Sequence, residues 1–107
     1  MNATERFQPI RNGLLEFAIL KIISARPVYV ADMLATLAKT EFKTQEGTLY
    51  PLLSRLRREG FLDYDWKESD VGPPRKYYSL KNKGENYLEE LQAYWNLIDK
   101  TLNSLSK

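Results

Sequence analysis

The chain has 107 residues, of which 43% are hydrophobic and 28% charged, and it contains neither cysteine nor histidine. This balance is typical of a folded, soluble protein of one domain, while the missing residue types exclude zinc fingers, thiol nucleophiles and catalysis by an imidazole base. The net charge of +2 is too small to indicate nucleic-acid binding, so any electrostatic argument has to be local.

The first six residues, Met1–Arg6, lack the basic and apolar regions of a signal peptide, and no apolar run is long enough to span a bilayer. We therefore expect a cytoplasmic protein with no membrane partner. Neither a metal nor a cofactor is expected. Because a domain this small buries only a modest core, a second apolar surface should go to a partner chain.

Two helices are predicted in the first part of the chain. Over about residues 10–25 the apolar residues follow two helical stripes, so this helix should be buried on two sides. The pair Arg26-Pro27 ends it, because proline disfavours a helical residue before it and has no backbone N–H. Apolar spacing predicts a second helix over about residues 30–40, followed by a turn.

A third helix is predicted over about residues 45–59. Thr44 is suited to the N-cap of this helix and Gly60 to its C-terminal cap. Pro51 removes one helical hydrogen bond and presses on the carbonyl of Gly47, so either Gly47 relieves the strain or the helix kinks. Four leucines form the inward face and leave the polar residues outside.

Beyond the third helix the periodicity changes to two, which predicts a β-hairpin over about residues 61–80. One side of the first strand carries Leu62, Tyr64 and Trp66. The turn-rich segment 69–74 joins the two strands and forms a protruding tip. In the second strand Tyr78 is predicted to lie in the core, whereas Tyr77 is assigned to neither face.

The last helix is predicted over about residues 82–107, with Asn82 as its N-cap. Its apolar residues are spaced alternately three and four apart, the a/d pattern of a coiled coil, and comprise Leu88, Leu91, Trp95, Ile98, Leu102 and Leu105. Because this seam covers less than three heptads, the helix should also pack against the first helix. We predict a homodimer joined through the seam and Leu14, in one compact unit with residues 1–81.

The order of these elements indicates the fold class. Three helices followed by a hairpin is the order of a winged helix-turn-helix, in which the third helix enters the major groove and the wing contacts the adjacent backbone. We predict a mainly α fold with a small β-hairpin (α+β). Residues 1–81 would form the DNA-binding domain, and residues 82–107 a coiled-coil-like dimerisation helix.

Two strings of residues give a more specific indication. The first is EGTLYPLL, from Glu46 to Leu53, and the second is GPPRKYYSL, from Gly72 to Leu80. Together with Arg55-Leu56 and Glu59-Gly60, they resemble the PadR family of bacterial transcriptional regulators. The resemblance extends over residues 12–105. The short last helix is similar to that of the compact subfamily, which includes multidrug-responsive repressors.

The resemblance implies a set of DNA-binding residues on the second helix, the third helix and the wing: Tyr29, Gln45, Thr48, Tyr50, Ser54, Arg55, Pro74, Arg75 and Lys76. Gln45 and Thr48 are short polar side chains near a helix N-terminus and suit base edges, whereas cationic side chains such as Arg75 suit phosphates. Arginines on an exposed helix are ordinarily only solvated surface. The motif around them favours DNA binding here.

Trp95 matches the position of a tryptophan that, in some compact relatives, pairs across the dimer and sandwiches flat aromatic drugs. The resemblance therefore implies a planar aromatic or cationic effector at the dimer interface, bound by Phe17, Leu88, Leu91, Trp95 and Asp99. A tryptophan at a seam position is otherwise core packing, and Asp99 could instead be a surface charge paired with Lys100. Both alternatives stay open.

We expect the dimer to bind an inverted repeat in promoter DNA and to repress a transporter or stress gene. Two alternatives stay open: a winged-helix protein that binds another protein, and a DNA regulator with no small-molecule effector. We predict no enzymatic activity, because Asp63 and Asp65 share one strand face with no base, nucleophile or metal cluster nearby in the sequence.

Overall fold

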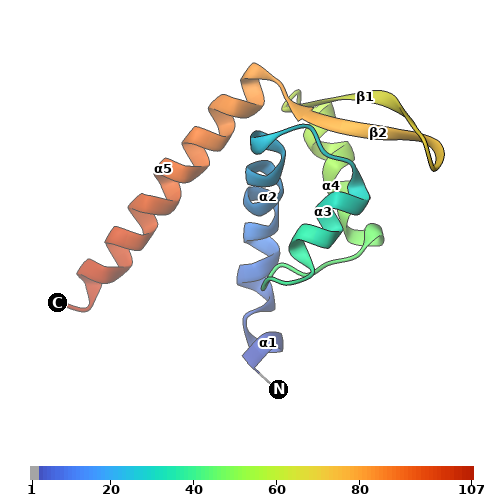
Figure 1. Ribbon diagram of the computed structural model, residues 1–107. Coiled ribbons are helices and arrows are strands. Elements are labelled where there is room, and N and C mark those ends of the chain that lie inside the picture. The colour runs from blue at the N-terminus through green and yellow to red at the C-terminus, as the bar shows by residue number, and fades with distance from the viewer. Residues whose placement is uncertain (1–2) are drawn as a thin grey trace.

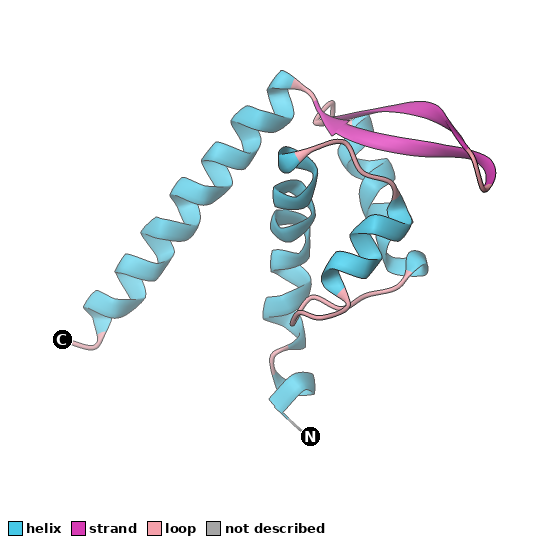
Figure 2. Cartoon of the chain, viewed as in Figure 1, coloured by secondary structure: helices cyan, strands magenta, loops and turns pink. Residues whose placement is uncertain are grey.

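A computed structural model of the chain describes residues 3–107 (Figure 1). Its elements are α1 (Ala3–Arg6), α2 (Gln8–Ala25), α3 (Val30–Leu37), α4 (Glu46–Arg58), β1 (Leu62–Ser69), β2 (Gly72–Leu80) and α5 (Asn82–Leu105). Helices dominate, and the two strands form one projecting hairpin (Figure 2). The prediction of a mainly α fold in a winged-helix arrangement is confirmed.

The core lies where α2, α3, α4 and the base of the hairpin meet. Its completely buried side chains are Ile19, Leu20, Met33, Leu49, Leu53 and Leu56. One stripe of α2 points into this core, and the second stripe, which includes Leu14 and Phe17, is half-buried beside α5. The helix is therefore covered on two sides, as its two apolar stripes predict.

Strands β1 and β2 pair antiparallel, with Leu62 opposite Leu80 and Trp66 opposite Lys76. Tyr78 is only 3% exposed, which confirms its predicted place in the core. Val28, between α2 and α3, exchanges two backbone hydrogen bonds with Tyr78, of 3.1 and 2.8 Å. This bridge fixes the base of the hairpin to the helical body, while the tip extends beyond the core (Figure 1).

The ends of the helices differ from the sequence prediction by a few residues. Helix α3 ends at Leu37, three residues before its predicted end. Thr44 is not the N-cap of α4, because the extended residue Gln45 holds that position and its carbonyl accepts the first helical hydrogen bonds. Asn82 is likewise the first helical residue of α5 rather than its N-cap. Each predicted N-cap is wrong by one residue, because several neighbouring polar residues at each helix start are suited to that position.

The predicted role of Gly60 at the end of α4 is confirmed. Gly60 has a φ of +86°, a conformation that only glycine adopts without strain. The N–H of Gly60 donates to the carbonyl of Arg57 and the N–H of Phe61 donates to that of Leu56, both at 3.0 Å. This pair of bonds is the Schellman motif. Helix α4 continues through Pro51 without a break in its assignment.

Helix α5 packs beside α2 near its start and separates from the body toward its C-terminal end (Figure 1). Lys21 of α2 donates a hydrogen bond of 2.6 Å to Gln92 of α5. The predicted packing of the last helix against the first is therefore confirmed. Over residues 3–107, the structure contains no helix with the length and hydropathy needed to cross a membrane.

Candidate DNA-binding surface

A groove of about 510 Å³ lies between α3, α4 and the hairpin. Its lining comprises Tyr29, Val30, Ala31, Glu46, Tyr50, Trp66, Pro74, Arg75 and Lys76. Five of the residues implied by the family resemblance therefore meet here, from three separate parts of the chain. The start of α3, the outer face of α4 and the second strand thus form one continuous surface.

Aromatic rings hold the basic side chains at this groove. The guanidinium of Arg75 lies 4.5 Å from the centroid of Tyr29, and Tyr29 in turn contacts Tyr77 at 5.3 Å between centroids. The ammonium of Lys67 lies 4.9 Å from the ring of Tyr77. A cation is attracted to the face of an aromatic ring, so these contacts hold positive charge in place on the wing.

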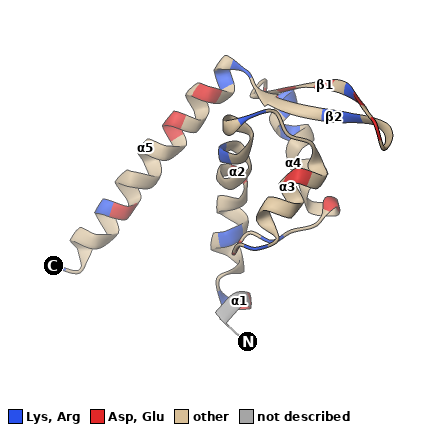
Figure 3. Ribbon diagram, in the orientation of Figure 1, with Lys and Arg blue, Asp and Glu red and all other residues tan. Residues whose placement is uncertain are grey.

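A second cluster of cations and aromatic rings surrounds Tyr64 of β1. Lys76 and Arg57 both approach the ring of Tyr64, at 3.9 and 4.4 Å from its centroid. Arg57 comes from α4, so this pair joins the third helix to the wing. Basic side chains accordingly gather at the C-terminal end of α4 and on the hairpin, interspersed with acidic ones (Figure 3).

Trp66 is a groove residue that the sequence analysis did not select. Strand alternation places it on the same side as Leu62, which is buried, and Tyr64, which is half-buried. The hairpin extends past the core, however, and Trp66 is 65% exposed and lines the groove. Only its distance from the start of the strand could have indicated this, because the same face changes from buried to exposed along β1.

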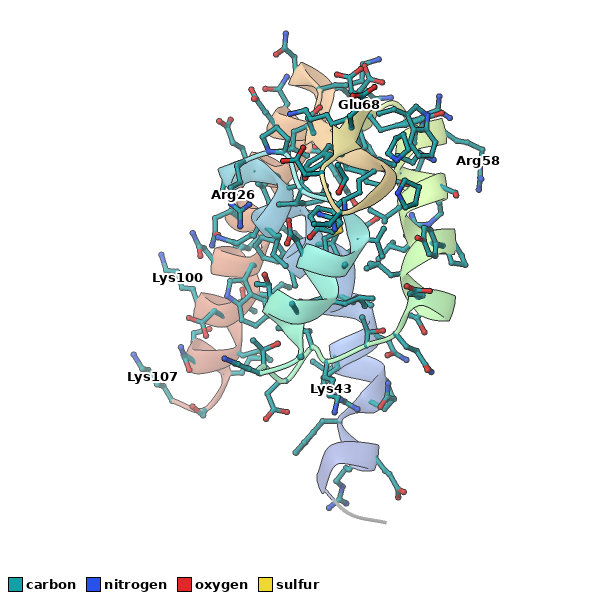
Figure 4. The ribbon with its side chains drawn as sticks, turned by 45° about the vertical axis from the view of Figure 1, so that its right-hand side comes forward. Arg26, Lys43, Arg58, Glu68, Lys100 and Lys107 are labelled. Atoms are coloured by element: carbon teal, nitrogen blue, oxygen red, sulfur yellow. The ribbon has the colours of Figure 1, made fainter. Side chains whose placement is uncertain are left out.

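The remaining predicted positions on α4 lie outside this groove. Gln45 and Ser54 are exposed, and Thr48 borders a smaller hollow beside Arg11 of α2. Arg55 is 46% exposed in its side chain and forms ion pairs with Glu16 at 3.1 Å and with Glu59 at 3.3 Å. Its guanidinium is therefore shared between solvent and two carboxylates. In contrast, Arg58 points outward from α4 (Figure 4).

Two apolar hollows are lined by residues of both α2 and α5. They have volumes of about 310 and 290 Å³ and share Leu14, Phe17 and Trp95 in their linings. Leu91 lines the first of them, so three of the five predicted effector residues come together. Leu88 packs instead against the core, and Asp99 is exposed without lining either hollow. The carboxylate that does line the first hollow is Glu16.

The predicted dimer seam is largely uncovered in this chain. Leu88, Leu91 and Ile98 are partly buried, whereas Trp95 is 42%, Leu102 is 62% and Leu105 is 74% exposed. Tyr94 and Leu97 on the same helix are exposed as well. The far half of α5 therefore presents a row of large apolar side chains to its surroundings.

Solved structures of other proteins are similar to this one over nearly their whole length. A PadR-like transcription factor from Bacteroides fragilis has a TM-score of 0.80 and 42% identity, covering 94% of this chain and 98% of that one. A PadR-like transcriptional regulator from Bacillus cereus has a TM-score of 0.79 and 40% identity, covering 89% and 93%. For a PadR family regulator from Eggerthella lenta the values are 0.86 and 28%, covering 96% and 90%.

Comparison of the sequence alone leads to the same family. A protein from Lysinibacillus sphaericus, described as uncharacterized, is 28% identical over 89 residues, which cover 80% of this chain and 82% of that protein. The profile of the family described as "Transcriptional regulator PadR-like family" matches residues 19–90, which span the C-terminal part of α2, the whole of α3, α4 and the hairpin, and the first part of α5. The chain therefore belongs to the PadR-like family of transcriptional regulators.

Proposed function

We propose that the protein is a homodimeric repressor that binds an inverted repeat in double-stranded promoter DNA. Helix α4 is its recognition helix, and the β1–β2 hairpin is its wing. The observation that carries this proposal is the groove shared by Tyr29, Tyr50 and Arg75, where cations rest on aromatic rings beside an exposed helix face. A transporter or stress gene is the proposed target.

The residues of this surface divide by chemistry into two groups. Gln45 and Thr48, in or beside the first turn of α4, would contact base edges, because short polar groups there reach into the major groove. Arg75 and Lys76 would contact phosphates beside it. The whole proposed contact set is Tyr29, Gln45, Thr48, Tyr50, Ser54, Arg55, Pro74, Arg75 and Lys76, to which we add Trp66.

The test is titration of a labelled duplex from upstream of the gene, at several salt concentrations, with scrambled duplex as competitor. Arg75→Ala should weaken binding and flatten its salt dependence, because one phosphate contact is lost. Lys100→Ala is the matched control, since it removes the same charge from α5 far from the groove (Figure 4). If the wild type binds no duplex at low salt, the protein-binding alternative replaces this proposal.

The proposed dimer joins two copies of α5 through Leu14, Leu88, Leu91, Trp95, Ile98, Leu102 and Leu105. Support comes from the exposed leucines at its far end, because monomeric proteins rarely leave such rows uncovered. Sedimentation analysis should find a dimer in the wild type and a monomer in Leu102→Glu. Asn103→Glu adds the same charge to the neighbouring exposed position and should leave the dimer intact.

A second proposal is that a planar aromatic cation relieves repression by binding between α2 and α5. The two hollows beside Phe17, Leu91 and Trp95 favour it, since flat rings stack on tryptophan. Proflavine should release the operator from the wild type but not from Trp95→Leu. Leu88 and Asp99 complete the proposed effector-binding residues. If Asp99 attracts the cation, Asp99→Asn should weaken the response to proflavine. A regulator without an effector would stay bound to the operator in the presence of proflavine, in the wild type and in both variants.

A further inference from the structure

Glu16, in the middle of α2, contacts side chains from two other helices. Its Oε1 lies 3.1 Å from a terminal nitrogen of Arg55 in α4, and its Oε2 accepts a hydrogen bond of 2.9 Å from the hydroxyl of Tyr87 in α5. The side chain of Glu16 is only 18% exposed. One shielded carboxylate therefore holds the recognition helix and the last helix at the same point.

Both partners of Glu16 make a second contact of their own. Arg55 also pairs with Glu59 one turn further along α4, at 3.3 Å. The ring of Tyr87 stacks on Phe61 with centroids 4.2 Å apart and planes 9° from parallel. Each end of the three-residue link therefore has one further contact, an exposed ion pair at Arg55 and a stacked ring at Tyr87.

The start of α5 has further connections to the end of α4. The ammonium of Lys83 donates a hydrogen bond of 2.6 Å to the carbonyl of Glu59, and the N–H of Lys81 donates one of 3.0 Å to the carbonyl of Phe61. Gly84 is buried against the same carbonyl so closely that a Cβ there would clash with it. The two helices are therefore joined at their adjoining ends, and Glu16 adds a contact about one helical turn from that junction on each helix.

We propose that Glu16 is a positioning residue for DNA binding, whose carboxylate keeps α4 and α5 in one fixed relative orientation. This inference rests on the proposed function, in which α5 joins the two copies and α4 enters the groove. The direction of α5 then sets the separation of the two recognition helices, and so the spacing of the half-sites that the dimer accepts. Arg55 serves this orientation in addition to any contact with phosphate.

Glu16 differs from the exposed charged residues because its carboxylate is shielded from water. An exposed ion pair such as Arg55–Glu59 contributes little, because water and salt screen it. The Glu16 carboxylate is mostly removed from water, so losing its charge removes the ion pair with Arg55 and leaves one acceptor oxygen for two donors. Glu16→Gln keeps the size of the side chain, and Glu59→Gln is its matched control, since the Arg55–Glu59 pair joins α4 only to its own C-cap residue.

The first measurement reads the helix orientation without DNA. The chain has no cysteine, so spin labels can be attached specifically at Arg58→Cys of α4 and Lys100→Cys of α5, both at outward positions (Figure 4). Dilution with unlabelled protein restricts the signal to distances within one chain. Glu16→Gln and Tyr87→Phe should each broaden the distance distribution, and Glu59→Gln should not. Circular dichroism verifies that each variant is folded.

The second measurement uses operators with half-sites moved closer or further apart by one or two base pairs. Glu16→Gln should reduce the preference for the native spacing by at least about fivefold. Tyr87→Phe should act in the same direction, and the double variant should add little, because both remove one link. If Glu16→Gln does not fold, Tyr87→Phe alone decides the question.

The proposal is overturned if Glu16→Gln and Tyr87→Phe leave both the distances and the spacing preference unchanged. It is also overturned if Glu59→Gln has as large an effect as Glu16→Gln, since the link across helices would then have no special part. A wild type that binds no DNA would remove the proposed function instead. The distance measurement would still decide whether Glu16 fixes the two helices.

Discussion

Arg75 of the wing rests on the ring of Tyr29, the residue that precedes α3, with 4.5 Å between the guanidinium carbon and the ring centroid. The wing and α3 are thus joined by side chains as well as by the backbone bridge of Val28. A basic residue at the rim of the groove is held in place before any phosphate reaches it. Less side-chain entropy is then lost on binding.

Tyr29→Ala is predicted to weaken operator binding by about two- to fivefold, because the cation–π contact that orients Arg75 is worth about 0.5–1 kcal/mol. Tyr29→Phe keeps the ring and should bind almost as the wild type does. Fluorescence anisotropy with the labelled operator measures both. Equal losses in the two variants would show that the tyrosine hydroxyl, and not the ring beneath Arg75, is what matters.

Glu46 places a carboxylate in the lining of the groove, where it would repel the phosphates of bound DNA. Glu46→Gln is therefore predicted to strengthen binding to scrambled duplex by about two- to fivefold, equivalent to about 0.5–1 kcal/mol for one surface charge. Glu90→Gln, which removes an exposed carboxylate of α5 that does not line the groove, is the matched control. Competition titrations at low salt compare them. An unchanged affinity for Glu46→Gln would place this carboxylate outside the DNA contact.

Burial, and then the hydrogen bond and charge of Glu16, raise the pKa of Tyr87 to about 12. The carboxylate of Glu59 acts in the same direction and Arg55 opposes it. The unfolded chain loses this proton near pH 10, before the folded chain does. The stability contributed by Tyr87 is therefore complete below pH 10 and lost as the pH rises toward 12.

The free energy of unfolding of the wild type should accordingly fall more steeply between pH 10 and pH 12 than that of Tyr87→Phe. Urea titrations followed by circular dichroism, at constant protein concentration, measure the difference. Tyr94→Phe controls for the loss of a hydroxyl from α5. Identical slopes for the wild type and Tyr87→Phe would contradict the prediction.

Gly84→Ala is predicted to destabilise the fold by about 1–3 kcal/mol, because its Cβ would press on the carbonyl of Phe61. Gly13→Ala is the matched change in α2, where a Cβ meets nothing within 4 Å. It should stabilise the helix by about 0.5–1 kcal/mol. Urea unfolding of both variants gives the comparison. A stable Gly84→Ala protein would mean that α5 can move away from the hairpin.

The sequence allowed helices α2 to α5, the hairpin and the inward place of Tyr78 to be predicted, but not the single turn of α1, because the prediction depends on local periodicity and turn residues. It could not show that Arg55 meets Glu16, or that Glu16 meets Tyr87 at 71 residues' distance, since such pairs depend on tertiary packing. The exposure of Trp66 could not be predicted from the sequence for a related reason. Strand alternation gives a face, but the extent of the core decides whether that face is covered.

The fit of Gly84 against Phe61 also limits which changes in chain length the protein can accept. An α-helix turns by about 100° per residue, so one residue inserted between β2 and Gly84 would rotate every side chain of α5 about the helix axis. The apolar row would then face another direction while the wing stayed in place. At the other end, residues 99–107 are all exposed within one chain, and those after Leu105 also lie beyond the proposed dimer seam. Additions or fusions are therefore better tolerated there.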